Sequence, residues 1–128
     1  MNRRFVLAGL AAGVSGLALP AFAGGHGRVG TFKSLRSYNV NGRAELVKAG
    51  SDGTIELLGD FSLDAAPDPK MALGKDGKYD PATLSGFVTK LKGASTYKLP
   101  SGVNPDDYNE VWVWCEKFNV GLAVAKLR

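Results

Sequence analysis

The chain contains very little of the two side chains that most often carry metal and nucleophilic chemistry. Its 128 residues include one cysteine, Cys115, and one histidine, His26. A single cysteine cannot form a disulfide within its own chain, and a single histidine excludes a blue-copper centre, which needs two. Zinc sites built from several cysteines and histidines, and c-type haem with its Cys-x-x-Cys-His attachment, are excluded as well. A serine or cysteine nucleophile would lack its usual base, because we expect His26 to be a solvated tail residue.

Long apolar runs and blocks of one charge are also missing after residue 23. Lysines alternate with acids along the chain, so no basic stripe for nucleic acid is expected. No apolar segment after Ala23 approaches the ~18–20 residues that a membrane span needs. Asp60, Asp64 and Asp68 recur every four residues, but the spacing is not that of a calcium loop. We therefore expect these acids to be solvated, and we expect no metal site.

The first 23 residues have the parts of an export signal. Arg3 and Arg4 supply a positive end, residues 5–19 form a short, glycine-containing apolar stretch, and Ala21-Phe22-Ala23 is a small-x-small cleavage site. The paired arginines are compatible with the twin-arginine route as well as with the Sec route. The sequence predicts a periplasmic or extracellular protein.

The remainder of the chain is expected to form one domain. Residues 24–29 are glycine-rich and predict a flexible leader, and residues 30–128 are enough for a single hydrophobic core. Short strand-like runs alternate with turn residues, and no helical period is sustained. This pattern predicts an all-β fold, an antiparallel β-sandwich or small β-barrel of about seven to nine short strands.

Four local features predict particular elements. Asn41-Gly42 is a strong hairpin signal between residues 31–40 and 43–49. Residues 64–69 suit an extended crossover loop. Met71 to Leu73 is a short strand followed by a polar loop over residues 74–80. Residues 81–91 are the only stretch with helical character.

The last two strands are expected to pair as a hairpin with Cys115 opposite Val120. The predicted partners further along the two strands are Val113 with Leu122, Val111 with Val124, Trp112 with Ala123, and Trp114 with Gly121. Both faces of this hairpin are apolar, so it should be central in the sheet and covered on each side. Cys115 then lies at the end of its strand, beside a turn. From the residues alone it is a buried hydrophobe, a free reactive thiol, a ligand, or half of an intermolecular bridge.

An ordered set of short motifs resembles a known family. The motifs are Gly30-Thr31-Phe32, Gly59-Asp60-Phe61-Ser62, Ala66-Pro67-Asp68-Pro69, Tyr97-Lys98-Leu99-Pro100, the run from Val111 to Phe118 with its Trp-Cys pair, and Ala123-Val124-Ala125. Together they are similar to the DM-thirteen domain, also called the electron-transfer DM-thirteen domain. The resemblance extends from about Gly30 to Leu127.

The resemblance implies an extracellular all-β module whose hallmark cysteine is Cys115. In larger members the domain accompanies DOMON-type modules linked to haem or sugar binding. The role proposed for the family is redox, with the cysteine as a bare thiol or as the ligand of a prosthetic group such as haem. Some relatives carry a histidine where this chain has Ser37 or Tyr38, so no second ligand is expected from that region.

Two hypotheses follow. In the first, the chain is an exported redox or electron-transfer module in which Cys115 is either a redox thiol or the axial ligand of a haem, with Trp112, Trp114 and Tyr97 lining the ring pocket. The thiol version needs an external redox partner or small thiol, because the chain has no second cysteine. In the second, it is a non-catalytic interaction domain, and Cys115 is a buried core residue.

Overall fold

The structure, a computed structural model, describes residues 27–128. Within this range the chain forms strands and two single-turn 3-10 helices but no α-helix. The strands are β2 (Arg28–Ser34), β3 (Val40–Asn41), β4 (Arg43–Ala49), β5 (Asp52–Leu57), β6 (Ser62–Leu63), β7 (Pro69–Lys75), β8 (Lys78–Asp80), β9 (Ser95–Lys98), β10 (Glu110–Cys115) and β11 (Val120–Lys126). The 3-10 helices are η1 (Pro81–Thr83) and η2 (Pro105–Asp107). The predicted signal peptide and His26 lie outside the described residues.

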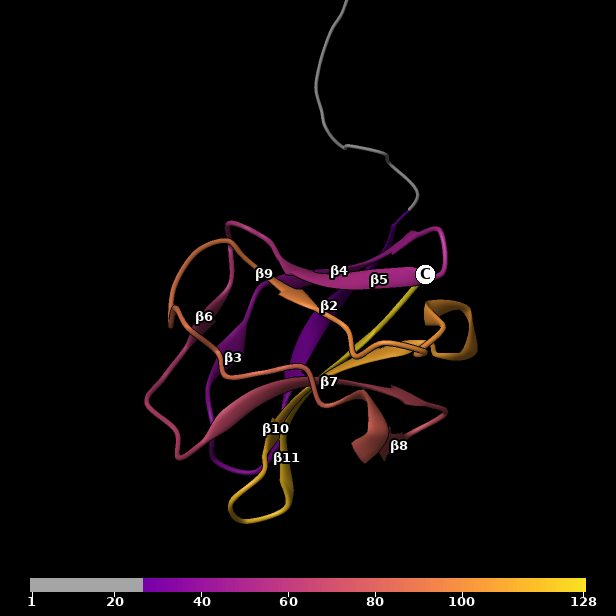
Figure 1. Cartoon of the computed structure of the whole chain (residues 1–128). Helices are drawn as coiled ribbons and strands as arrows, with labels where there is room; N and C mark the ends of the chain where they lie inside the picture. Colours follow the sequence, from indigo (N-terminus) through magenta and orange to yellow (C-terminus); the bar gives the residue numbers. More distant parts are fainter. Residues whose placement is uncertain (1–26) are drawn as a thin grey trace, which may run out of the picture.

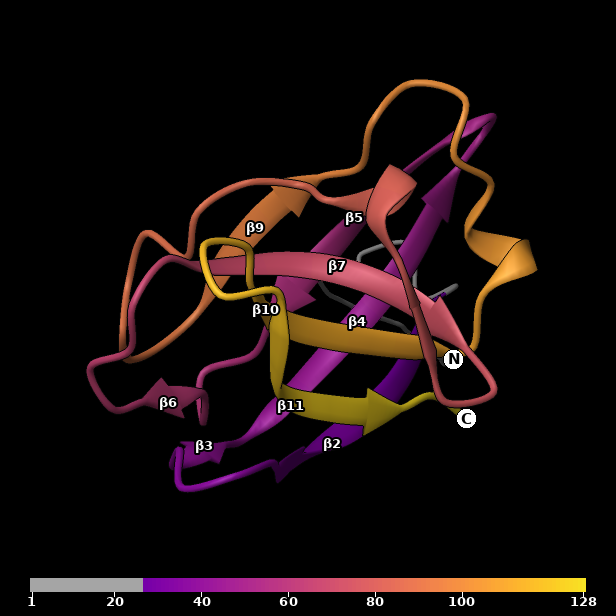
Figure 2. The ribbon, with the colours of Figure 1, turned by 90° about the horizontal axis from the view of Figure 1, so that it is seen from below.

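Eight of the strands form one antiparallel sheet in the order β8-β7-β10-β11-β2-β4-β5-β9. The sheet bends into a half-barrel, so that β4, β5 and β9 lie over β7 and β10 (Figure 1). Strands β3 and β6 form a small second sheet at one side (Figure 2). The prediction of an all-β fold is confirmed, with ten strands in place of seven to nine. Because β10 has neighbours on both edges, the expectation of a central position for this strand is also met.

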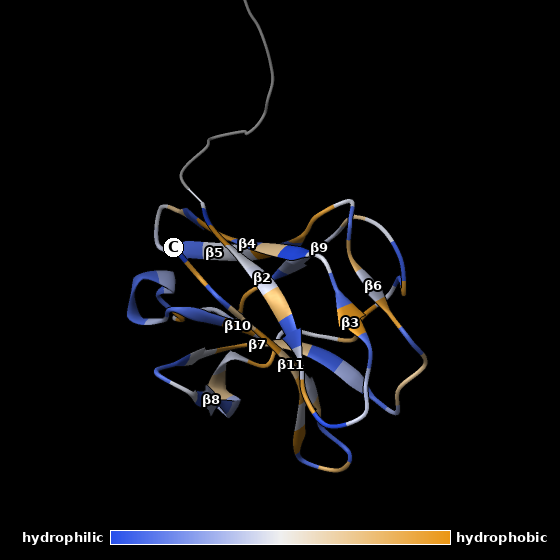
Figure 3. Cartoon of the chain, turned by 180° about the vertical axis from the view of Figure 1, so that it is seen from behind, coloured by the Kyte–Doolittle hydropathy of each residue, from blue (hydrophilic) through white to orange (hydrophobic). Residues whose placement is uncertain are grey.

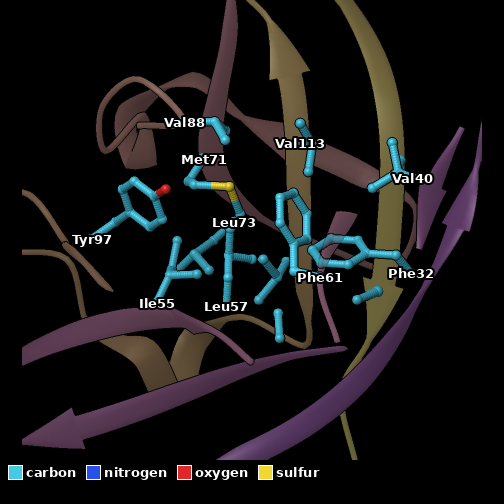
Figure 4. Packing of buried hydrophobic residues seen from close by; sticks show 14 of the residues in the cluster. Phe32, Val40, Ile55, Leu57, Phe61, Met71, Leu73, Val88, Tyr97 and Val113 are labelled. Atoms are coloured by element: carbon cyan, nitrogen blue, oxygen red, sulfur yellow. The ribbon is translucent and has the colours of Figure 1, made fainter. Parts of the chain in front are cut away.

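The hydrophobic core fills the space between the two halves of the bent sheet. Strands β4 and β5 alternate buried and exposed residues, whereas β7 and β10 are buried on both faces over most of their length. Figure 3 shows hydrophobic and hydrophilic residues interchanging at short intervals along the strands. Side chains from both halves meet in the centre, among them Ile55 and Leu57 from one side and Leu73 and Val113 from the other (Figure 4).

The Asn41-Gly42 hairpin prediction is wrong, although the strands that it was meant to join do pair. Strand β2 pairs with β4 through Arg28–Thr31 and Arg43–Leu46. Asn41, however, belongs to β3 and pairs with Ser62 of β6, so residues 35–42 form an excursion and not a two-residue turn. Val40, which lies within this excursion, is buried in the core and pairs with Leu63 of β6. Burial of this side chain favours the long-range pairing over the local turn. The first strand also begins at Arg28, within the segment that was predicted to be a flexible leader.

Residues 69–80 form a hairpin where a short strand and a polar loop were predicted. Strand β7 spans seven residues and pairs with β8, with Lys75 opposite Lys78. Asp76 and Gly77 therefore make a two-residue turn, and both have positive φ angles, of 52° and 89°. Asp-Gly is a favoured pair for such a turn because both central residues need φ above zero.

The predicted helix over residues 81–91 is limited to the three residues of η1. Beyond it the chain runs along the first half of β7, where Ser85 donates its N–H to the carbonyl of Met71 and Val88 donates to Pro69. Gly86 has a φ of 122°, which is incompatible with an α-helix. Tertiary hydrogen bonds to a sheet edge thus replace a weak local helical preference.

The β10–β11 hairpin has the predicted partners at its turn and different ones further along. Cys115 lies opposite Val120 and Trp114 opposite Gly121, as expected. A β-bulge then shifts the register, so that Val113 lies opposite Ala123, Trp112 opposite Val124 and Val111 opposite Ala125. The extra residue is Leu122, whose carbonyl accepts a hydrogen bond from the N–H of Leu35 at 2.9 Å.

Candidate functional site

Cys115 is the last residue of β10, and its side chain is completely buried. It lies between Pro69 of β7 and Val120 of β11, and its exposed fraction is 0%. Side chains alternate between the two faces of a strand. Val111, Val113 and Cys115 therefore face the core together, and all three belong to the central hydrophobic cluster.

The end of β10 that holds Cys115 is tied to the start of β7 by charged side chains, which lie on the Trp114 face of the sheet because Lys70 is the partner of Trp114. Lys70, the residue after Pro69, forms ion pairs with Asp68 at 3.5 Å and with Glu116 in the β10–β11 turn. Asp68 also accepts the backbone N–H of Lys117 at 2.9 Å. The hydrogen bond that Lys70 donates to Glu116, together with the charge of Asp68, raises the pKa of Lys70 above its usual value, so Lys70 is a cation at neutral pH. We call Asp68, Lys70, Glu116 and Lys117 the rim cluster; it connects the start of β7 to the turn after Cys115.

The other face of β10 carries Glu110, Trp112 and Trp114. Trp112 is 8% exposed and Trp114 is half-buried. The ring of Tyr79 from β8 stacks on Trp114 with 3.7 Å between centroids and 13° between planes, and Trp112 meets Trp114 edge-on at 5.8 Å and 71°. Three aromatic rings thus form one continuous cluster on the side of the sheet opposite to Cys115.

Two glycines leave room for the indole of Trp112. A Cβ at Gly121 would lie 2.7 Å from the Trp112 ring, and a Cβ at Gly74 would lie 2.4 Å from its Nε1. The indole therefore lies across the backbone of neighbouring strands. Its Nε1–H donates to the carboxylate of Glu110 at 3.1 Å, and the other oxygen of Glu110 accepts the N–H of Gly77 at 2.9 Å. Glu110 is only 3% exposed, so these two donors are its principal partners in place of water.

A hollow of about 430 Å³ lies over the aromatic cluster. It is lined by Leu35, Arg36, Gly77, Lys78, Tyr79, Trp112, Trp114, Asn119, Val120 and Gly121. The cluster is therefore partly accessible from outside, whereas Cys115 does not line this hollow. Burial raises the pKa of Tyr79, with a smaller contribution from Glu116, so its phenol keeps its proton.

Tyr97 lies away from both tryptophans. It is 6% exposed and sits on β9, the strand at the opposite end of the sheet from β8 (Figure 2). Its hydroxyl accepts the N–H of Thr89 at 3.2 Å and shares a hydrogen bond of 2.8 Å with Ser95. The four side chains singled out in the sequence are therefore divided: Cys115 and Tyr97 face the core, and Trp112 and Trp114 face away from it.

This arrangement does not fit a haem held by Cys115. A flat ring ligated by the Cys115 sulfur would lie on the core face, where the side chains are packed together, and it could not also contact Trp112 and Trp114 across the backbone of the sheet. The three loop acids also do not form a common site, because each has a different partner. Asp60 pairs with Arg43, Asp64 accepts from Asn39, and Asp68 belongs to the rim cluster. Within residues 27–128, no three His, Cys, Asp or Glu side chains are grouped so as to hold a metal ion.

Two residues on this face of the sheet were missed from the sequence. Tyr79 was assigned to a polar loop, and Glu110 was not singled out. The Asp76-Gly77 turn signal would have placed Tyr79 on a hairpin next to β7. The spacing of Glu110, Trp112 and Trp114 by two residues would have placed the carboxylate and both indoles on one face.

The fold and the site first define a class: a small antiparallel β-module with one buried, unpaired thiol and an aromatic cluster behind it. The family model described as Electron transfer DM13 matches residues 31–127. The chain belongs to this family, which confirms the resemblance drawn from its motifs, and it is a module of the redox or electron-transfer type. Comparison with curated proteins and with solved structures gave no match. In the part of the chain that the structure describes, no helix has the length and apolar character needed to cross a membrane.

Proposed function

We propose that the domain is an exported electron-transfer module in which Cys115 is a gated redox thiol. The thiol exchanges with a partner disulfide or thiol when the end of β10 opens at the rim cluster. The observation that carries this proposal is the position of the only cysteine: it is the last residue of its strand, and only surface ion pairs tie the turn that follows it to the start of β7. Export is supported by the paired arginines, apolar stretch and cleavage motif of residues 1–23.

The energetics of the rim favour local opening. Ion pairs near the surface contribute little to stability, so the two pairs of Lys70 hold the end of β10 only weakly to β7. Cys115 and Pro69 form a non-hydrogen-bonded pair, because Pro69 directs its carbonyl away from β10, to the N–H of Val88. Opening the last residues of the β10–β11 hairpin therefore exposes much less surface than global unfolding, and it should require a smaller free energy.

The chemistry at the open rim is thiol–disulfide exchange. The Cys115 thiolate attacks one sulfur of a partner disulfide, a mixed disulfide forms, and the other partner sulfur leaves as a thiolate. A thiol from a second molecule must then attack the partner sulfur of the mixed disulfide and release the Cys115 thiolate, because the chain has no other cysteine; this second thiol is oxidised and the partner disulfide is reduced. A small thiol or a dithiol protein is the required class of partner.

The test is the rate at which a thiol reagent labels the native chain as a function of urea concentration. Labelling through the rim should depend only weakly on urea, because little surface is exposed, and labelling through global unfolding should follow the full urea dependence of stability. Replacing Lys70 by Met should raise the native labelling rate, since both ion pairs between the start of β7 and the β10–β11 turn are lost. Lys48→Met is the matched control, because it removes a similar ion pair, with Asp106 at 2.6 Å, elsewhere on the surface.

A second function is favoured by one observation, the complete burial of Cys115. Under this alternative the chain is an interaction domain and the thiol is a core residue. Labelling would then require global unfolding in both the native chain and Lys70→Met, and Cys115→Ala would reduce stability by only ~1–2 kcal/mol. That outcome would overturn the gated thiol. A mixed disulfide formed at low urea with an added small disulfide, detected as a mass increase at Cys115, would support it.

The haem alternative has its own readout. We expect the purified exported protein to show no Soret band. A Soret band that Cys115→Ser abolishes would contradict the inference that the packed core face leaves no room for a haem at Cys115.

A further inference from the structure

The aromatic cluster behind β10 joins the surface to a buried hydrogen bond. Tyr79 and Trp114 are half-buried and stack at 3.7 Å, and Trp112, 5.8 Å from Trp114, is almost fully buried. Such ring contacts are close enough for rapid electron exchange between neighbouring π systems. The chain contains two tryptophans, and both belong to this cluster.

The inner end of the cluster has a base in the position that indole oxidation requires. Loss of one electron makes the indole N–H far more acidic, comparable to a carboxylic acid, so a neutral tryptophanyl radical forms readily only where an acceptor can take the proton. Glu110 accepts the Nε1–H of Trp112 at 3.1 Å and is 3% exposed. Hydrogen bonds to an ionised carboxylate are stronger than neutral ones, and the low-dielectric surroundings enhance this. The N–H of Gly77 holds the second carboxylate oxygen and so fixes the orientation of the base.

We propose that Tyr79, Trp114 and Trp112 form a one-electron relay that ends in proton transfer from Trp112 to Glu110. A one-electron oxidant binds above the Tyr79–Trp114 stack; it is a metal-centred or organic-radical acceptor. It takes one electron from the stack, and Trp112 supplies an electron to the stack in its place. Trp112 then loses its Nε1 proton to Glu110, which leaves a neutral indole radical and a neutral carboxylic acid, while the oxidant is reduced by one electron. Return of an electron from a donor, and of the proton from Glu110, restores the starting state.

This relay is a second redox site and does not depend on the gated thiol. Cys115 and the relay lie on opposite faces of β10, and the relay needs no opening of the rim cluster. Electrons could therefore pass through the relay while the fold stays closed. The two proposals can therefore fail separately, and Cys115→Ser distinguishes them, since it removes the thiol and leaves every relay residue in place.

The test uses the full chain and a photogenerated ruthenium(III) polypyridyl complex as the one-electron oxidant. We expect a neutral tryptophanyl radical, identified by electron paramagnetic resonance of freeze-quenched samples and by transient absorption. Trp112→Phe should eliminate the neutral radical. Glu110→Gln should also eliminate it, because the amide cannot take the proton, and its fold is checked by circular dichroism. Tyr38→Phe, which alters a phenol outside the cluster, and Cys115→Ser should leave the radical yield unchanged.

Two outcomes would overturn the relay. One is an undiminished neutral radical in Trp112→Phe or in folded Glu110→Gln, which would place the radical or its base elsewhere. The other uses the unmodified chain alone, so it holds even if Glu110→Gln does not fold. After complete exchange of the indole N–H for deuterium, the neutral radical should form more slowly in heavy water, because its formation includes proton transfer to Glu110. Equal rates in the two solvents would contradict the mechanism.

Discussion

Glu110 is the residue whose replacement the structure predicts most sharply. Its carboxylate accepts two hydrogen bonds, from the N–H of Gly77 at 2.9 Å and from Trp112 Nε1 at 3.1 Å, and it is 3% exposed. Glu110→Ala leaves the buried Nε1–H of Trp112 without a partner, at about 1–3 kcal/mol, whereas the N–H of the exposed Gly77 can bond to water. Part of this cost is offset because the alanine variant no longer buries a charge. We therefore expect a loss of about 1–3 kcal/mol in the free energy of unfolding.

Glu110→Gln should be intermediate between the native chain and Glu110→Ala. The amide oxygen can accept one of the two hydrogen bonds, but its NH2 group then faces the other donor, at a cost of about 1–3 kcal/mol. A domain of this size has about 5–15 kcal/mol of total stability, so the glutamine variant should stay folded. The Glu110→Gln measurement of the relay experiment requires a folded variant.

The assay is equilibrium unfolding in urea, followed by tryptophan fluorescence and by circular dichroism. Asp52→Asn, an exposed acid at the start of β5, is the matched control and should change stability by less than about 0.5 kcal/mol. The reasoning would be refuted by a Glu110→Gln variant as stable as the native chain, or by a Glu110→Ala variant that loses less than Asp52→Asn.

Two further predictions concern the packing and the electrostatics of the same half of the molecule. Gly121→Ala would place a Cβ 2.7 Å from the Trp112 ring and should cost about 1–3 kcal/mol in urea unfolding, whereas Gly59→Ala, where nothing lies within 4 Å, should be nearly neutral; equal effects would contradict the packing argument. The hydrogen bond to Asp80, together with burial, raises the pKa of Tyr108 from 10.0 to about 12. The stability from this pair should therefore be fully present below pH 10 and lost as the pH rises through about 12. Alkaline absorbance titration should show one late-titrating tyrosine that Asp80→Asn returns towards 10, and an unchanged titration would refute the pairing.

The period-two pattern and the turn residues were enough to predict the fold class. They were not enough to predict connections that depend on distant partners. Asn41 pairs with Ser62 of β6, so its local turn preference is overridden by a pairing across twenty residues of chain. Asp76-Gly77 shows the converse, since a valid turn signal was hidden among polar residues that resembled a loop.

The register of the last hairpin shows why one residue can limit a sequence prediction. The partner of Cys115 was correct because the turn fixes it, but the bulge at Leu122 changes every pair beyond Trp114. Leu122 and Ala123 are both buried, so hydrophobicity does not reveal which of them is the extra residue. The burial of Cys115 was one of the readings that the sequence left open. Its rim cluster depends on Lys70, whose strand was not predicted to begin at Pro69.

The residue types suited to one-electron and thiol chemistry lie close together in this chain. Its one cysteine and two tryptophans all fall within Trp112–Cys115, on a strand with neighbours on both edges. The alternation of side chains then separates them: the thiol points into the core and the indoles point to the opposite face. The thiol exchange that we propose requires the end of β10 to open, so it should accelerate when salt screens Lys70 from Asp68 and Glu116. Radical formation at Trp112 involves no such opening and should be insensitive to salt when an uncharged oxidant is used. A salt series on the two reactions therefore shows whether β10 carries two independent redox functions or one.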